Sequence, residues 1–215
     1  MKRIISAITG SILLVWSSFA QAEIQFGFGL MTGNLSTDGT ETEGTAADTS
    51  TRSKSFEEFF YGGDLFIENI SDSGLTIGLS YVPLDLDIGE GKRTDSAVAT
   101  ASGGAENDTG DRSASAEVSD LFTLYTNVPM GTDGWYALGG VHFATIETTE
   151  SLPNSSYGNE DIYGYQIGLG RRVENAKVEL SYSDFEDIDI TASGGNSNSV
   201  SAEADSLQLR VSFGF

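Results

Sequence analysis

Residues 207–215 constrain the fold of this 215-residue chain more than any other segment. Apolar and polar side chains alternate there without a break. Successive side chains of a strand point to opposite faces. One face therefore carries Leu207, Leu209, Val211, Phe213 and Phe215, and the other carries Gln208, Arg210, Ser212 and Gly214. A strand with an apolar outer face and a polar inner face is typical of a transmembrane β-barrel.

The N-terminal segment has the pattern of a secretory signal peptide. Met1 is followed by two basic residues, an apolar stretch over 4–16 and a small-residue motif that ends at Ala22. A membrane anchor helix is the weaker interpretation, because a span needs about 18 or more apolar residues. We therefore predict a cleaved signal peptide over 1–22 and an outer-membrane β-barrel domain over 23–215. The sequence has no cysteine, which excludes disulfides and thiolate metal sites.

Alternating apolar residues elsewhere in the chain predict seven further strands. The eight expected strands cover 23–33, 56–69, 74–90, 116–128, 134–148, 160–171, 176–190 and the C-terminal segment. Pro83 interrupts the third of them, which a bulge or an exposed strand extension would tolerate. Three connections are short (70–74, 129–134 and 172–176), and four are long and polar (34–55, 91–115, 149–159 and 191–202). This alternation is typical of an up-and-down barrel with short periplasmic turns and long extracellular loops.

Aromatic residues lie near the expected ends of these strands. Four tyrosines, Tyr61, Tyr81, Tyr163 and Tyr182, lie toward the predicted outer ends, while Trp135 and Phe215 lie toward the periplasmic ends. Aromatic girdles of this kind mark both interfaces of transmembrane barrels. We expect these six side chains to form them.

Matching motifs in the two halves of the chain indicate a duplicated four-strand unit. Tyr-Gly occurs at 61–62 and 163–164, Leu-Ser-Tyr at 79–81 and 180–182, Thr-Ala-Ser-Gly-Gly at 100–104 and 191–195, and Ser-Ala-Glu at 115–117 and 201–203. The alternative is that barrel hairpins converge on similar residues. The five-residue match in two polar segments is the harder one to explain by convergence.

The chain resembles the small eight-stranded outer-membrane barrels of the OmpX/Ail and OmpA transmembrane-domain type. The resemblance rests on the signal peptide, the eight alternations, the long connections and the Leu-Gln-Leu-Arg-Val-Ser-Phe-Gly-Phe terminus. It implies an all-β, eight-stranded antiparallel barrel in the cell outer membrane, in contact with lipid and lipopolysaccharide. It also implies that Phe213 and Phe215 form the signal read by the barrel-assembly machinery. Members of this superfamily include adhesins, small channels and lipid A enzymes, so fold alone does not choose a function.

Several charged residues are expected to face the lumen. Arg210 shares this orientation with four carboxylates, Glu58, Asp64, Glu68 and Glu179. An unpaired charge is costly in a low-dielectric interior, so we expect ion pairs there. A structural plug is the simpler interpretation, and a gate in which Arg210 changes partner is the alternative.

His142 also faces the lumen in the predicted register. It is the only histidine of the chain, and so the only candidate for a general base near neutral pH. No catalytic Ser or carboxylate partner can be identified from residue spacing.

The predicted outer rim is strongly acidic. The formal net charge is −21, and loss of Lys2 and Arg3 with the signal peptide lowers it to −23. This charge disfavours nucleic-acid binding, which needs clustered Lys and Arg. The candidates for a weak Ca²⁺ or Mg²⁺ site are Asp85, Asp87, Glu90, Asp187 and Asp189. The alternative is a solvated acidic surface, since no calcium-loop spacing is present.

These observations predict a non-enzymatic outer-membrane barrel with long acidic extracellular loops, a structural or surface-interaction role and an unknown extracellular ligand. No cofactor is expected beyond an ion at the acidic rim. Two alternatives remain. One is a narrow passive channel, and the other is a lipid A-modifying enzyme that uses His142.

Overall fold

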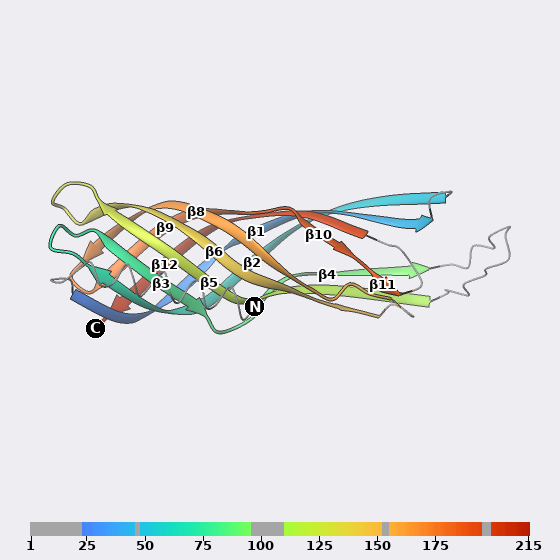
Figure 1. The fold of residues 1–215 in the computed structure, drawn as a ribbon, viewed down its shortest axis with the longest axis horizontal. Helices are drawn as coiled ribbons and strands as arrows, with labels where there is room; N and C mark the ends of the chain where they lie inside the picture. Colours follow the sequence, from blue (N-terminus) through green and yellow to red (C-terminus); the bar gives the residue numbers. More distant parts are fainter. Residues whose placement is uncertain (1–22, 46–47, 96–109, 152–154, 195–198) are drawn as a thin grey trace.

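A computed structural model describes residues 23–45, 48–95, 110–151, 155–194 and 199–215. Eight strands form a closed ring in which each neighbouring pair is antiparallel (Figure 1). In ring order they are β1 (Glu23–Thr45), β2 (Asp48–Ile70), β3 (Thr76–Val82), β5 (Gly110–Pro129), β6 (Trp135–Glu150), β8 (Asn159–Val173), β9 (Ala176–Phe185) and β12 (Ser199–Gly214). The predicted eight-stranded barrel is confirmed. The predicted signal peptide lies outside the described residues.

Pairing between the first and last strands closes the ring. Gly27 pairs with Gly214 at one end of this ladder, and Thr42 pairs with Ser199 at the other. Beyond the ladder, the Phe215 amide donates to the Phe26 carbonyl at 2.7 Å. No helix in the described part of the chain is long and apolar enough to cross a membrane.

Four further strands lie at one end of the barrel. They are β4 (Leu86–Asp95), β7 (Ser155–Ser156), β10 (Ile188–Thr191) and β11 (Ser193–Gly194). We call the half of the barrel that carries them the extended half. The turn half carries the short turns and the C-terminus (Figure 1). The predicted short turns therefore share one end of the molecule.

The prediction of long polar loops was partly wrong. The segment 34–55 is a continuation of β1 and β2, which stay paired as far as Thr45 and Asp48. Residues 110–115 and 149–150 likewise belong to β5 and β6. Their Ser, Thr and Gly content indicated loops, yet a strand that projects into water needs no apolar outer face. The matched loop motif at 100–104 lies outside the described residues.

Apolar side chains point outward in the turn half and inward in the extended half. In the turn half of β1, Phe26, Phe28 and Leu30 are exposed on the outside. In the extended half of the same strand, the outward side chains are polar and Leu35 is buried inside. A bulge between Ser119 and Phe122 produces the same reversal in β5, because the extra residue re-aims the side chains beyond it.

The extended half consists of two four-stranded sheets, β4-β5-β6-β8 and β2-β1-β12-β10. An apolar core lies between them. It contains Leu35, Ile88, Val118, Ala144, Ile146, Ile162, Ile188, Ile190 and Ala204. This half is therefore packed like a β-sandwich.

The matched motifs lie four strands apart in the ring. The two Tyr-Gly pairs lie in β2 and β8, the two Leu-Ser-Tyr motifs in β3 and β9, and the two Ser-Ala-Glu motifs in β5 and β12. The third and seventh strands of the ring both break and continue, as β4 and β10. The architecture thus agrees with a duplicated four-strand unit.

Candidate functional site

The interior of the turn half is filled by two layers of charged groups. Glu68 forms the centre of the layer nearest the short turns and is fully buried. Its carboxylate accepts hydrogen bonds from Arg172 and Lys177, each at 2.7 Å, and from the Tyr125 hydroxyl at 3.0 Å. Lys177 is itself only 1% exposed. Two cations and one phenol therefore satisfy a single buried carboxylate.

Arg210 forms the centre of the next layer. It makes a bidentate pair with Asp64, in which Nε donates to Oδ1 at 2.9 Å and Nη2 donates to Oδ2 at 2.7 Å. Nη1 donates to Glu179, whose other carboxylate oxygen accepts the Tyr136 hydroxyl at 2.8 Å. Planar guanidinium is suited to such forked pairing.

Phe66 separates the two layers. Its ring lies between the Lys177 ammonium, 4.5 Å from the ring centroid, and the Arg210 guanidinium, 5.1 Å from it. Both contacts have cation–π geometry. Gly27 makes room for this ring, because a Cβ at Gly27 would lie 2.3 Å from Cζ of Phe66. The two layers together hold three cations and three carboxylates, and we call this set the plug: Asp64, Glu68, Arg172, Lys177, Glu179 and Arg210.

The structure brings together most of the residues predicted for the lumen, with one exception. Glu58 is an even number of residues from Asp64 in β2 and was therefore expected to face inward. It is exposed, because it lies where β2 continues into the extended half. Arg172 and Lys177 were missed at the sequence level because they border a predicted turn. The signal was present in the strand alternation, since Lys177 has the parity of Glu179, and Arg172 has the parity of Gln166 in the strand before it.

His142 lies above the plug, toward the extended half, and is 6% exposed. Its Nδ1 is 2.8 Å from the Thr123 hydroxyl, and its Nε2 is 3.0 Å from the Ser183 hydroxyl. The ring also stacks on Phe185, with 5.4 Å between ring centroids. The partners described for both ring nitrogens are thus hydroxyl groups that hold the imidazole in place.

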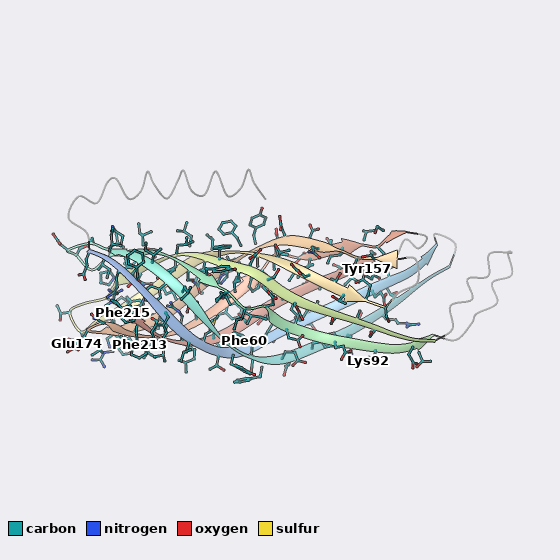
Figure 2. The ribbon with its side chains drawn as sticks, turned by 90° about the horizontal axis from the view of Figure 1, so that it is seen from below. Phe60, Lys92, Tyr157, Glu174, Phe213 and Phe215 are labelled. Carbon is teal, nitrogen blue, oxygen red and sulfur yellow. The ribbon has the colours of Figure 1, made fainter. Side chains whose placement is uncertain are left out.

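The six predicted girdle residues all lie on the outer wall. Tyr61 is 82% exposed, Tyr81 stacks on Phe122, and Tyr163 and Tyr182 project from β8 and β9. Trp135 lies at the turn end, where the Arg171 guanidinium is 5.7 Å from its ring. Phe213 and Phe215 both lie within about 6 Å of the Phe28 ring at the same end (Figure 2). Their role as an assembly signal stays a prediction.

Two of the acidic rim residues have partners nearby in the sequence. Asp87 accepts the amide of Gly89 at 2.9 Å, and Glu90 pairs with Lys92 at 3.0 Å. Among the described residues, no group of three or more His, Asp or Glu side chains is arranged to hold a metal ion. Asp85, Asp187 and Asp189 are exposed. Binding of Ca²⁺ or Mg²⁺ at this rim stays a prediction.

Comparison with solved structures defines the fold. The outer membrane protease OmpT from Escherichia coli superposes with a TM-score of 0.53 and 9% sequence identity, over 91% of this chain and 97% of that chain. The chain has the fold of the small outer-membrane β-barrel proteins. OprG from Pseudomonas aeruginosa matches with a TM-score of 0.49 and 11% identity, over 88% of this chain and 96% of that one.

The attachment invasion locus protein Ail of Yersinia pestis matches with a TM-score of 0.40 and 11% identity, over 90% of this chain and 99% of that chain. No family model matches the sequence, and no curated protein matches it either. Identities of this size support the fold and leave function to be argued from the site.

Proposed function

We propose that this protein is a closed, non-enzymatic barrel of the outer membrane that displays its extended half on the cell surface. The apolar outer face of the turn half supports the membrane location, since it is continuous around the ring and encloses a polar interior. The polar outer face of the extended half supports its exposure to water. Lipid and lipopolysaccharide are then the surroundings of the wall.

The plug is the observation that supports a closed barrel. Six charged side chains pair across the lumen. Two tyrosine hydroxyls donate further hydrogen bonds to the carboxylates of Glu68 and Glu179. Removal of one partner from a buried pair costs about 3–5 kcal/mol, because it leaves the other charge unpaired. A steady ion path would have to break several such pairs at once. This argument favours a structural plug over a passive channel.

The surroundings of His142 support a non-enzymatic role. A serine or threonine nucleophile needs a base that a third group orients, most often a carboxylate. The partners described for His142 are the hydroxyls of Thr123 and Ser183, which lie inside the barrel wall. These contacts fit a packed polar layer better than a lipid A-modifying site.

Single-channel recording in planar bilayers tests the closed state. We expect no steady conductance from the wild-type protein. Arg210→Ser should produce intermittent conductance at least about tenfold above the wild-type level, because Asp64 and Glu179 lose their shared cation. Arg171→Ser is the matched control, since Arg171 is exposed at the turn end. Steady wild-type conductance would overturn the closed barrel and favour the channel.

A further inference from the structure

The barrel wall has a seam on one side of the extended half. Backbone pairing between β2 and β3 ends at Leu65 and Tyr81. Beyond this point β2 pairs with β1, and β4 pairs with β5, so the described residues contain no ladder between β2 and β4. Pro83 lies where the ladder stops, and proline has no amide hydrogen to donate. We call this junction the β2–β4 seam.

Side-chain contacts close the seam where hydrogen bonds are missing. A Cβ at Gly62 of β2 would lie 3.4 Å from Cδ2 of Leu86, so the Leu86 side chain covers this glycine. Farther out, a Cβ at Gly89 of β4 would lie 3.2 Å from Cδ1 of Phe56. Contacts of this kind can part by rotation of a side chain, without the loss of backbone hydrogen bonds.

The opposite seam, between β8 and β10, is closed differently. The Glu186 amide donates to the Tyr163 carbonyl, and the Tyr163 amide donates to the Glu186 side chain, each at 2.9 Å. The two four-strand units of the ring therefore differ at their seams. Apolar side chains meet across the β2–β4 seam instead.

An apolar cavity of about 40 Å³ lies directly behind the β2–β4 seam. Phe60 and Leu86 belong to both the seam and the cavity wall, and Figure 2 shows Phe60 partway along the barrel, between its two ends. The other apolar lining residues are Leu35, Val118, Leu121 and Phe185. Its polar floor consists of His142, Ser183, Ser206 and Gln208, and no lining residue is acidic, Lys or Arg.

The outer mouth of the seam is apolar as well. Phe59 is 68% exposed, Tyr61 is 82% exposed and Leu84 is 65% exposed. Phe59 and Tyr61 are the last outward apolar residues of β2, and Leu84 follows the end of β3 at Val82. Tyr61 belongs to the predicted tyrosine girdle. In the proposed membrane orientation, a molecule that reaches this mouth from the side comes from the bilayer.

We propose that the β2–β4 seam admits the end of one acyl chain of a membrane lipid into the apolar cavity. A water molecule needs about 10–15 Å³ of such a cavity, so a volume of about 40 Å³ accommodates a few terminal carbons, while a polar headgroup stays outside. The apolar lining matches a hydrocarbon chain, whose burial needs no hydrogen-bond partner. This proposal rests on the proposed membrane location, because the lipid is the source of the chain.

Photo-crosslinking in liposomes tests the proposal. The probe is a phosphatidylethanolamine that carries a diazirine at the end of one acyl chain, and mass spectrometry locates the adducts. We expect adducts on the inward residues Phe60, Leu86 or Leu121, in addition to adducts on the outward apolar face. Leu86→Trp fills the cavity and should reduce the inward adducts at least about tenfold. Leu180→Trp adds the same ring to the outward face of β9, away from the seam, and should leave them unchanged.

Adducts confined to outward residues such as Leu30 and Leu65 would overturn the acyl-chain site and leave the membrane location intact. A protein without adducts on its outward face would instead contradict the membrane location. Equal inward labelling in Leu86→Trp and wild type would also overturn the site. If Leu86→Trp does not fold, the wild-type adduct map decides the question alone.

Discussion

Two glycines shape the polar interior at the scale of single residues. A Cβ at Gly78 would lie 2.3 Å from the Tyr125 ring, and a Cβ at Gly170 would lie 2.3 Å from the Tyr136 ring. Each tyrosine therefore lies flat against a bare stretch of backbone on the neighbouring strand. This position carries the Tyr125 hydroxyl to Glu68 and the Tyr136 hydroxyl to Glu179. Glycine is required at these positions for space, and not for an unusual backbone conformation.

Gly170→Ala should destabilise the barrel by about 1–3 kcal/mol, because the new methyl group displaces the Tyr136 ring and its bond to Glu179. Gly139→Ala is the matched control, since a Cβ there has no neighbour within 4 Å. We expect the control to change stability by less than about 0.5 kcal/mol. Urea unfolding in detergent micelles, followed by the fluorescence of Trp135, measures both. Equal effects of the two substitutions would contradict the role of Gly170.

At the scale of single strands, one chain segment serves two environments. The turn half of β6 presents Trp135, Val141 and Phe143 outward, whereas its extended half buries Ala144 and Ile146 inside. The period of two is unchanged, and only the chemistry of the two faces is exchanged. The extended half is therefore stabilised by its own apolar core, in the manner of a water-soluble sandwich.

Ile146→Ala should cost about 2–5 kcal/mol, because Ile146 is 3% exposed in the core of the extended half. We expect the loss to be local. Amide hydrogen exchange should accelerate over 114–119 and 144–150 and remain slow over 136–142. Thr149→Ala, on the exposed side of the same strand, should leave exchange unchanged. Equal acceleration along all of β6 would show that the two halves unfold as one unit.

At the scale of the whole molecule, the two ends of the barrel differ in length and chemistry. The short turns and the C-terminus lie at one end, and the acidic hairpins lie at the other (Figure 1). An up-and-down barrel of even strand number returns its C-terminus to the side on which it started. The proposed function therefore assigns the turn end to the periplasm and the extended end to the outside.

Cysteine labelling of intact cells tests this orientation, because the chain contains no native cysteine. Ser201→Cys lies on the exposed face of the extended half, and Ser73→Cys lies in the turn between β2 and β3. Both substitutions replace an exposed hydroxyl by a thiol. A membrane-impermeant maleimide should label the first variant on intact cells and the second only after permeabilisation. The opposite result would invert the proposed orientation.

The interior shows which properties of the charged residues the sequence predicts and which it does not. The inward orientation of Arg210, Asp64, Glu68 and Glu179 follows from strand alternation, and the structure places these side chains inside. Their pairing does not follow, because Arg210 and Asp64 are 146 residues apart and meet only when the ring closes. The exposed position of Glu58 likewise depends on where β2 leaves the closed ring.

The sequence alone determined the strand count, the short turns and the face to which each side chain of the turn half points, since all of these depend on a local period of two. The tertiary structure decided the continuation of the strands beyond the predicted loops, the inner core of the extended half and the β2–β4 seam. These features depend on which strands lie side by side and on where their pairing stops. The physical reason is that facing is a local property of a strand, whereas pairing and burial are properties of the closed ring.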